Sequence, residues 1–471
     1  MNRRKFFRNG SLFTIGTAVL NPLEGTAQVL DINNLDKNKK AKNIIFMVSD
    51  GMSTGTLNMA DLYLNRKNGK GSNWLQLYKD QRISRALMDT ASASSIVTDS
   101  AAASSSWGGG ARVNNGSLNV GPNGERNMPI WQKFKKAGKM AGCVTTVPIT
   151  HATPAGFCVN SDSRNAQAEI AEEYLKLGFD VMMGGGNNYF SADKRKDKKD
   201  VYADYKAKGW QVARTRGEMM AASNDKPILG VFADDGLPYT IDRRSSKELT
   251  DNTPTLAEMA QKAIDRMKGH KNGFVLQIEA GKVDWGAHAN DIGAVLYDQT
   301  AFDDAIKAVI DFAEKDGNTL VVITTDHGNA NPGIIYGKEA NSNFDSIQNY
   351  TQTNEWILNS IHSDSSVDQV REIIKHANGR TISQEEAKTI LGYYTGLEKE
   401  DGLYNYKHLP FKAFAEMQKE HNSVGWISMN HSADYVELAM FGPGSQLLKP
   451  FVKNIDLHYL MLEAAEVENK F

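Results

Sequence analysis

Six short runs of apolar residues recur along the 471-residue chain, and most of them show no alternation between apolar and polar positions. Continuous apolar runs of this length are typical of strands covered on both faces, whereas alternation indicates a sheet with one solvated face. The predicted strands are residues 43–48, 141–147, 179–184, 273–278, 319–325 and 435–442. The pattern therefore predicts a central, mostly parallel sheet.

A helical pattern separates the fourth predicted strand from the fifth. Its apolar residues recur every three or four positions, and Gly317 then supplies a stop signal. The apolar positions are Val295, Phe302, Ile306, Val309 and Ile310. Strand, helix and strand in succession form a βαβ unit, so we expect an α/β fold in which helices sandwich the sheet.

Residues 337–425 differ in character from the rest of the chain. They are rich in charged and polar residues, lack strand-like runs and contain helical segments at 366–379 and 383–394. The second segment begins with Ser383 and Glu386 in the spacing of a capping box. This region is predicted to be a largely helical insertion in the core fold.

The composition narrows the class of protein and of partner. Hydrophobic residues make up 41% and charged residues 23% of the chain, as in globular proteins with a sizeable core. A formal net charge of −2 gives no sign of nucleic-acid-specific binding. Cys143 and Cys158 are the only cysteines, and both a disulfide and two buried thiols remain open for them.

The first 27 residues predict an export signal. Paired Arg3 and Arg4 precede a modestly apolar stretch and small residues around Ala27, an order that resembles a bacterial twin-arginine signal peptide. The apolar stretch is shorter than the roughly 20 residues that span a bilayer, so no stable membrane anchor is expected. A basic tail without structure is the alternative. We predict a signal peptide at 1–27, one large domain at 28–471, and a periplasmic or secreted protein.

Polar residues with metal-binding side chains follow directly after the predicted strands. Ligands of open α/β sheets bind beyond the carboxyl ends of the strands, and carboxylates and imidazoles are ligands of divalent metals. The residues are Asp50, His151, Thr153, Glu279, Asp326 and His327. Asp284 and His288 add a pair spaced to share one side of a helical turn. Taken singly, Asp50 could equally cap a helix, and Asp284 and His288 could form a surface ion pair.

Taken together, these donors predict two metal sites. Asp284 and His288 with one further histidine would form a site with an open position, and Asp50 with Asp326 and His327 would form a second. Two ions about 4 Å apart clamp the attacking and leaving oxygens of an in-line displacement at phosphorus. Hydrolytic phosphoryl transfer is the chemistry that this arrangement favours.

Residues 97–110, VTDSAAASSSWGGG, supply a candidate nucleophile. A serine in the first turn of an Ala/Ser-rich helix lies near the positive end of the helix dipole, and a neighbouring zinc would further favour its alkoxide. Ser100 has this position, and the small residues after it would let the helix start lie close to the metals. Alternatively, Thr98, Asp99 and Ser100 only cap the helix.

Six motifs in this order resemble those of the alkaline phosphatases and extend over residues 43–442. They are SDGMSTG, TDSAAASSSWGGG, HATPAG…SDSR, IEAGKVDWGAHAND, TTDHGNA and NHSAD. The resemblance implies an alkaline phosphatase catalytic domain at 28–471 that hydrolyses phosphate monoesters at alkaline pH through a phosphoserine. It also implies a broad range of small phosphate monoesters as substrates, a role in phosphate scavenging, and a homodimer.

The resemblance further implies a role for each site residue, with two zinc ions and one magnesium ion per chain. Ser100 would be the nucleophile and Arg164 would bind two phosphate oxygens. Asp284, His288 and His431 would bind the first zinc; Asp50, Asp326 and His327 the second; and Asp50, Thr153 and Glu279 the magnesium. His151 and Trp285, taken as substrate-binding residues, are similar to a pairing in marine and cold-adapted bacterial members. This pairing leaves the occupancy of the third metal site and the pH optimum open.

The remaining histidines are predicted to be outside the site. His431 is preferred over His421 only because its HSA context is similar to that of the family. The others, including His270, His362, His376, His408 and His458, lie in polar contexts and are predicted to be on the surface.

Three alternatives remain at this stage. A phosphodiesterase and a sulfatase share the same superfamily scaffold, but Ser100, Glu279 and Arg164 favour monoesters, and the Cys/Ser-x-Pro-x-Arg pattern of sulfatases is absent from the sequence. A non-catalytic phosphate- or metal-binding protein is the third, although every nucleophile and ligand position is filled.

Overall fold

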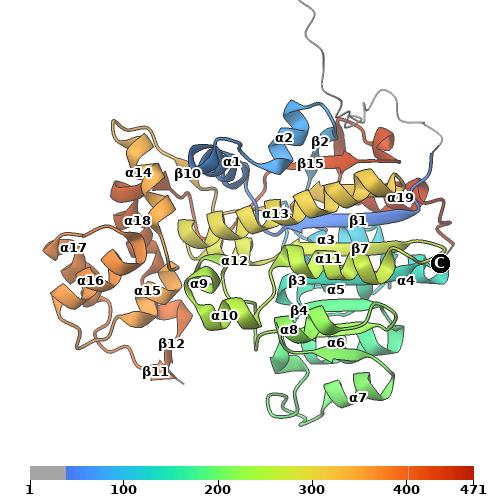
Figure 1. The fold of residues 1–471 in the computed structure, drawn as a ribbon, viewed down its shortest axis with the longest axis horizontal. Coiled ribbons are helices and arrows are strands. Elements are labelled where there is room, and N and C mark those ends of the chain that lie inside the picture. Colours follow the sequence, from blue (N-terminus) through green and yellow to red (C-terminus); the bar gives the residue numbers. More distant parts are fainter. Residues whose placement is uncertain (1–38, 401, 471) are drawn as a thin grey trace, which may run out of the picture. The chain divides into compact units, whose positions relative to one another are not determined.

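A sheet of ten strands runs through residues 39–400 and 402–470, the part of the chain that the computed structural model describes (Figure 1). Its order is β16-β2-β15-β8-β1-β7-β3-β4-β6-β5. The strands are β1 (Asn43–Ser49), β2 (Ser84–Asp89), β3 (Met140–Pro148), β4 (Val181–Gly185), β5 (Gln211–Ala213), β6 (Ile228–Val231), β7 (Phe274–Ala280), β8 (Thr319–Thr324), β15 (Val436–Phe441) and β16 (Phe451–Lys453). All neighbours from β8 to β5 are parallel, and only β15 runs antiparallel to its partners, so the predicted mostly parallel sheet is confirmed.

Helices cover both faces of the sheet. The core helices are α1 (Thr54–Asn68), α2 (Asn73–Lys79), α3 (Ser100–Gly109), α4 (Ile130–Lys136), α5 (Ala152–Cys158), α6 (Gln167–Leu177), α7 (Val201–Ala207), α8 (Arg216–Ala221), α9 (Thr240–Ser245), α10 (Lys247–Asn252), α11 (Leu256–Met267), α12 (Lys282–His288), α13 (Ile292–Asp316) and α19 (Asp456–Ala464), with 3₁₀ turns η2 (Asn187–Tyr189) and η5 (Ser445–Leu447). Phe46 of β1 packs on Trp107 of α3 and Phe157 of α5, whereas Ile45 and Met47 share the opposite core with α11 and α13. Figure 1 shows α11 and α13 in front of the sheet and α3 and α5 behind it.

All six predicted strands and the predicted helix are present in the structure. The six predicted strands are β1, β3, β4, β7, β8 and β15, and the predicted helix is α13, which ends at Gly317 in the left-handed conformation with φ 63°. The unpredicted strands β2, β5, β6 and β16 lie at or next to the sheet edges. β5, β6 and β16 have only three or four residues, which is too few for a clear apolar pattern, and half of the residues of β2 are polar.

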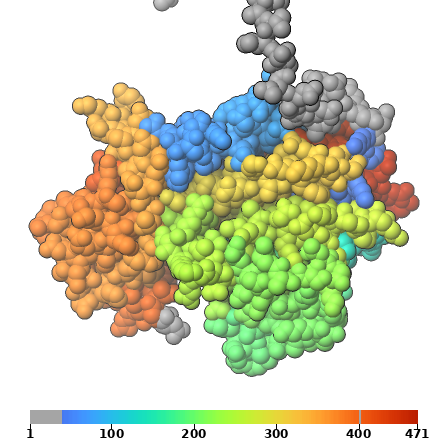
Figure 2. Space-filling model, in the orientation of Figure 1, coloured from blue at the N-terminus to red at the C-terminus, as the bar shows by residue number. Residues whose placement is uncertain are grey.

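Residues 337–425 are mostly helical, and Figures 1 and 2 show them in orange beside α9 and α10. Their helices are α14 (Ala340–Ser346), η3 (Ile347–Asn349), α15 (Asn354–Ser360), α16 (Val367–Asn378), α17 (Gln384–Gly392), η4 (Tyr406–His408) and α18 (Phe411–Asn422). The predicted capping box of Ser383 and Glu386 is present at the start of α17. The expectation that strands are lacking is wrong in detail, because β11 (Lys399–Glu400) pairs with β12 (Leu403–Tyr404), and β13 (Val424–Gly425) pairs with β10 (Gly333–Ile334).

Two sequence predictions concern the ends and the cysteines of the chain. The predicted signal peptide at 1–27 lies outside the described residues. Within the described part, no helix combines the length and the apolar composition that a membrane crossing requires. Cys143 of β3 and Cys158 of α5 are buried free thiols whose sulfur atoms lie 3.7 Å apart.

His458 is not on the surface, and that prediction is wrong. The ring is fully buried between α19 and α3, where Nδ1 donates to the Trp107 carbonyl at 2.9 Å and Nε2 lies 3.0 Å from Lys133 Nζ. Its helix turns Leu457 and Met461 into the same core, which places His458 inside with them. Of the other predicted surface histidines, His362, His376 and His408 are exposed and His270 is half-buried.

Candidate active site

Four adjacent strands deliver acidic and imidazole side chains to one edge of the sheet. Because β8, β1, β7 and β3 are neighbours and parallel, their carboxyl ends meet there. Asp50 follows β1, Glu279 lies near the end of β7, and Asp326 and His327 follow β8. All four residues are at most 1% exposed. Residues far apart in the sequence are thus brought together as predicted.

Three groups of donor atoms at this edge are close enough to share a metal ion. Within each group the ligand atoms lie within 4.8 Å of one another. The groups are Asp284, His327 and His431; Asp50, Asp326 and His327; and Asp50, His151 and Glu279. The second group matches the predicted second zinc set. The first contains His327 where His288 is predicted, and the third contains His151 where Thr153 is predicted.

His288 and Thr153 nevertheless lie beside these groups. His288 Nε2 is 3.5 Å from Asp284 Oδ2, one helical turn away on α12, and 3.0 Å from His431 Nε2. His431 Nε2 is in turn 3.4 Å from Asp284 Oδ1. Thr153 Oγ1 lies 3.5 Å from Asp50 Oδ2. Every predicted metal ligand is therefore at the same edge of the sheet.

A short strand pair brings His431, and not His421, to the candidate site. β14 (His431–Ser432) pairs antiparallel with β9 (Gly328–Asn329), which directly follows His327. This pairing places His431 next to Asp284. His421 instead ends α18 in the insertion, where its Nε2 lies 2.8 Å from Glu386 Oε1.

Several carboxylates of the site are buried close to His327, whose Nε2 lies 3.2 Å from Asp326 Oδ2 and 3.6 Å from Asp50 Oδ1. Within residues 39–400 and 402–470, Asp50 Oδ1, Asp326 Oδ2 and Glu279 Oε1 accept no hydrogen bond. Burial, and then repulsion by Asp326, raises the pKa of Asp50 well above its ordinary value, and burial raises the pKa of Glu279 to about 8. Buried anions are costly unless they are paired or bind metal, so the cluster is suited to divalent cations.

One member of the cluster is held as an anion by its histidines. Burial opposes ionisation of Asp284, but the hydrogen bond from His431 and the charge of His288 outweigh it and lower the Asp284 pKa. Burial likewise opposes protonation of His431, yet the hydrogen bond and the charge of Asp284 raise its pKa to about 9. Asp284 is therefore stabilised as a carboxylate and His431 as an imidazolium when the two side chains face each other.

Ser100 begins α3 at the edge of this cluster. Asp99 is the N-cap, and its carboxylate accepts the N–H of Ala102 at 2.9 Å. Ser100 Oγ lies 3.4 Å from His327 Nε2, and the residue is 1% exposed. A helix N-terminus stabilises a negative charge on such an oxygen.

The small residues after Ser100 also allow a close contact between two helices. They let α3 lie against α5: a Cβ on Gly108 would be 1.9 Å from the Gly156 carbonyl oxygen, and a Cβ on Gly156 would be 2.6 Å from Ser104 Cβ. Only glycine permits such an approach of two backbones. The contact joins the helix that begins with Ser100 to the helix that carries Thr153.

Arg164 contacts Asp99, which precedes α3, and His151, which precedes α5. Its Nη1 donates to Asp99 Oδ2 at 3.0 Å, and its Nη2 lies 3.1 Å from His151 Nε2. Burial, and then the positive charge of Arg164, lowers the pKa of His151 to about 3, so this imidazole is neutral and Nε2 accepts. The Trp285 ring meets His151 edge-on, with centroids 6.1 Å apart.

Comparison with known proteins decides the family. The family model for alkaline phosphatase matches residues 41–467. The chain belongs to the alkaline phosphatase family. Alkaline phosphatase 4 of Bacillus subtilis is 31% identical over 424 residues, covering 88% of this chain and 87% of the relative, and the Escherichia coli alkaline phosphatase is 30% identical over 62% of this chain and 71% of its own.

Solved alkaline phosphatase structures share the fold. The Thermus thermophilus enzyme has 31% identity and a TM-score of 0.84, covering 95% of this chain and 96% of its own. The cold-active alkaline phosphatase of a Shewanella species has 24% identity and a TM-score of 0.77, with 90% and 99% covered. The predicted α/β architecture is thus confirmed, and the alkaline phosphatases are metal-dependent, in agreement with the donor groups.

Two residues of this alkaline phosphatase site escaped prediction. Asn329 Nδ2 donates to Asp284 Oδ1 at 2.7 Å, and Thr145 Oγ1 donates to Glu279 Oε2 at 2.5 Å. Both orient a predicted metal ligand. Asn329 lies within the quoted TTDHGNA motif and Thr145 within a predicted strand, but neither position has a pattern that reveals its partner.

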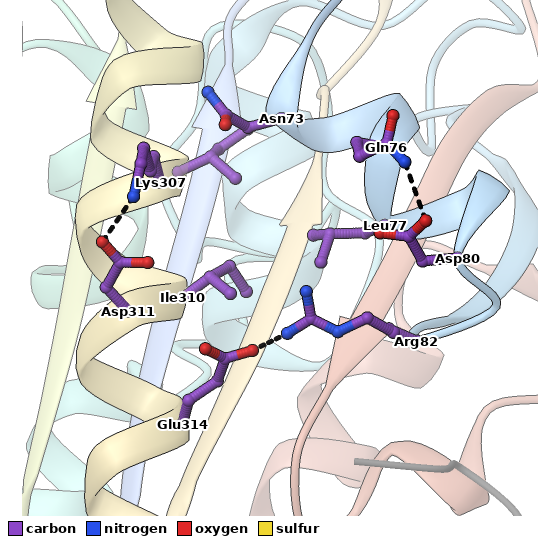
Figure 3. Close-up of a pocket in the computed structure, with 10 residues that line it drawn as sticks. Asn73, Gln76, Leu77, Asp80, Arg82, Lys307, Ile310, Asp311 and Glu314 are labelled. Carbon is purple, nitrogen blue, oxygen red and sulfur yellow. Dashed lines mark hydrogen bonds and ion pairs between the residues drawn. The ribbon is translucent and has the colours of Figure 1, made fainter. Parts of the chain in front are cut away.

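A hollow elsewhere in this alkaline phosphatase lies apart from the candidate active site. It lies between α2 and α13, and Figure 3 shows six of its polar side chains in three pairs, namely Gln76 with Asp80, Lys307 with Asp311 and Arg82 with Glu314. Gln76 Nε2 donates to Asp80 Oδ1 at 2.7 Å, and Lys307 Nζ donates to Asp311 Oδ2 at 2.6 Å. None of the predicted site residues lines it.

Proposed function

We propose that this chain hydrolyses phosphate monoesters through a phosphoserine on Ser100. One observation carries the proposal. Buried carboxylates with oxygens that accept no hydrogen bond from the described residues lie around Ser100, the first residue of α3, and Arg164 lies beside them. As a proposed assignment, Asp284, His288 and His431 hold one zinc ion, Asp50, Asp326 and His327 a second, and Asp50, Thr153 and Glu279 a magnesium ion. His151 and Trp285 would lie against the bound substrate.

The donor set fits such ions. Asp50, Asp326 and Glu279 each have a carboxylate oxygen without a hydrogen bond in the described part of the chain, and divalent cations bind such oxygens. The imidazoles of His327 and His431 suit zinc. When bound, the zinc ions would supply Lewis-acid stabilisation of the attacking and leaving oxygens. Every protein ligand is supplied by residues around the sheet edge.

The residues of the chain itself perform the rest of the reaction. The Arg164 guanidinium, held by Asp99, would bind two phosphate oxygens and align phosphorus with Ser100 Oγ. Ser100 Oγ loses its proton and forms the new bond to phosphorus. The bond between phosphorus and the ester oxygen breaks, and the departing oxygen takes up a proton to become the alcohol. Water then breaks the Ser100–phosphorus bond, which releases inorganic phosphate and restores the hydroxyl. Two in-line displacements give net retention at phosphorus.

The alternative is a phosphodiesterase on the same scaffold. The test compares hydrolysis of an aryl phosphate monoester with that of the matching diester at alkaline pH, with zinc and magnesium supplied. A large preference for the monoester is expected, and a preference for the diester would contradict the proposal. A binding protein without catalysis would leave no acid-stable phosphoserine, whereas the enzyme should yield one that Ser100→Ala abolishes.

The wider role is also proposed. A broad range of phosphate monoesters and a role in phosphate scavenging fit a site whose assigned contacts address the phosphate. Export as a periplasmic or secreted protein would follow from the predicted signal at 1–27, with 28–471 as the catalytic domain including the 337–425 insertion. A homodimer is proposed from the family, and sedimentation of the purified chain tests it.

A further inference from the structure

Lys282 is a buried cation beside the proposed active site. It opens α12, two residues before Asp284, and is 6% exposed. Its ammonium lies 3.7 Å from the centroid of the Tyr239 ring and 4.5 Å from that of Trp285. In the described part of the chain its Nζ makes no hydrogen bond and no ion pair within 4.0 Å. Two aromatic faces are therefore its nearest partners.

The position of Lys282 is unfavourable for a lysine that serves only α12. A cation at a helix N-terminus opposes the helix dipole, and the side chain of Lys282 is buried, which removes its charge from water. Contacts between a desolvated cation and aromatic rings offset such costs. The stabilising contact that Lys282 provides is thus with Tyr239 and Trp285.

Trp285 links Lys282 to the residues proposed to bind phosphate, because its indole also packs against His151. Gly236 lies so close to the indole that a Cβ there would be 2.8 Å from Trp285 Cζ3. The indole meets His151 edge-on with centroids 6.1 Å apart, and His151 Nε2 lies 3.1 Å from Arg164 Nη2. Trp285 is therefore held between the Lys282 ammonium, the Gly236 backbone and the His151 ring.

We propose that Lys282 is a positioning residue for phosphate binding. Its ammonium, held between Tyr239 and Trp285, fixes the indole, and the indole keeps His151 and Arg164 in the orientation that grips phosphate. The inference rests on the proposed function, because it takes Arg164 as the phosphate ligand. Lys282 itself touches no reacting atom.

The test replaces Lys282 with Met, which keeps the length of the side chain and removes its charge. Measured are the inhibition constant of inorganic phosphate, KM and kcat for an aryl phosphate monoester, and the metal content. We expect phosphate to bind about fivefold to tenfold more weakly with unchanged metal content, and Lys282→Arg to restore most of the affinity. The matched control is Lys399→Met, because Lys399 Nζ also lies over a ring, 4.8 Å from that of Tyr404, but in the insertion.

A double-mutant cycle separates positioning from mere stabilisation. If Lys282 acts through Trp285, Lys282→Met should have little further effect on phosphate affinity in a Trp285→Phe background. Additive effects, or wild-type phosphate affinity in Lys282→Met, would overturn the inference. If Lys282→Met loses metal, Lys282→Gln with the same cycle takes its place. Failure of the wild-type protein to hydrolyse monoesters would instead contradict the proposed function.

Discussion

Polar side chains are paired in the helical insertion, whereas several carboxylate oxygens at the carboxyl edge of the sheet have no hydrogen bond within residues 39–400 and 402–470. In the insertion, Glu386 closes a capping box with Ser383 and also lies 2.8 Å from His421, so its charge is satisfied locally. At the sheet edge, carboxylate oxygens of Asp50 and Asp326 are buried without a hydrogen bond. Polar groups of the insertion thus pair with one another, whereas the sheet edge buries carboxylate oxygens that are suited to bind cations.

The sharpest test of this contrast uses two carboxylate–histidine pairs. Asp284→Asn should lower the metal content by at least one ion per chain and cut turnover more than about 100-fold, since even partners of metal ligands often cost 10- to 100-fold. Glu386→Gln is the control and should leave metal content and turnover unchanged. Metal analysis by mass spectrometry with steady-state kinetics measures both. Equal metal loss in the two variants would break the comparison.

His458 is a buried group that, unlike Asp50, is fully satisfied, and it should make stability depend on pH. Burial, and then the charge of Lys133, lowers its pKa to about 4. On acidification from about pH 6.5 the unfolded chain binds a proton that the folded chain refuses, so up to roughly 3 kcal/mol of stability is lost by about pH 4. Urea unfolding across this range should show a smaller loss for His458→Asn. His408→Asn, at an exposed position, should retain the wild-type slope.

Two arginine–aspartate pairs of equal length sharpen the comparison further. Arg164 to Asp99 and Arg126 to Asp162 both measure 3.0 Å, but the first is mostly buried and the second is exposed. Asp99→Asn keeps a cap acceptor for α3 yet removes the charge that orients Arg164. The inhibition constant of phosphate should therefore rise about tenfold, whereas Asp162→Asn should leave it unchanged. A response of both variants would contradict the assigned role of Arg164.

The smallest effect is expected in the insertion. Ser383→Ala removes the N-cap of α17 and should cost about 1 kcal/mol of unfolding free energy in denaturant titrations. The kinetic constants should stay those of the wild type, because this cap lies among residues that satisfy one another. A clear change in KM would show that the insertion contributes to the site.

Sequence patterns alone predict the central strands, α13 and several of the candidate site residues. Long apolar runs identify buried strands, and the side chains that follow them meet because parallel neighbours end at one edge. Asp50, Glu279, Asp326 and His327 could be predicted from this rule alone.

The places of the other residues depend on how distant elements pack together. His431 comes to Asp284 through a strand pair of two residues, and His458 is buried because α19 packs on α3, neither of which leaves a periodic signal. Asn329 and Thr145 donate to residues far away in the sequence, and Lys282 lies over the ring of Tyr239 from another segment. The physical reason is that local patterns report which face a residue presents, whereas its partners depend on how distant elements dock.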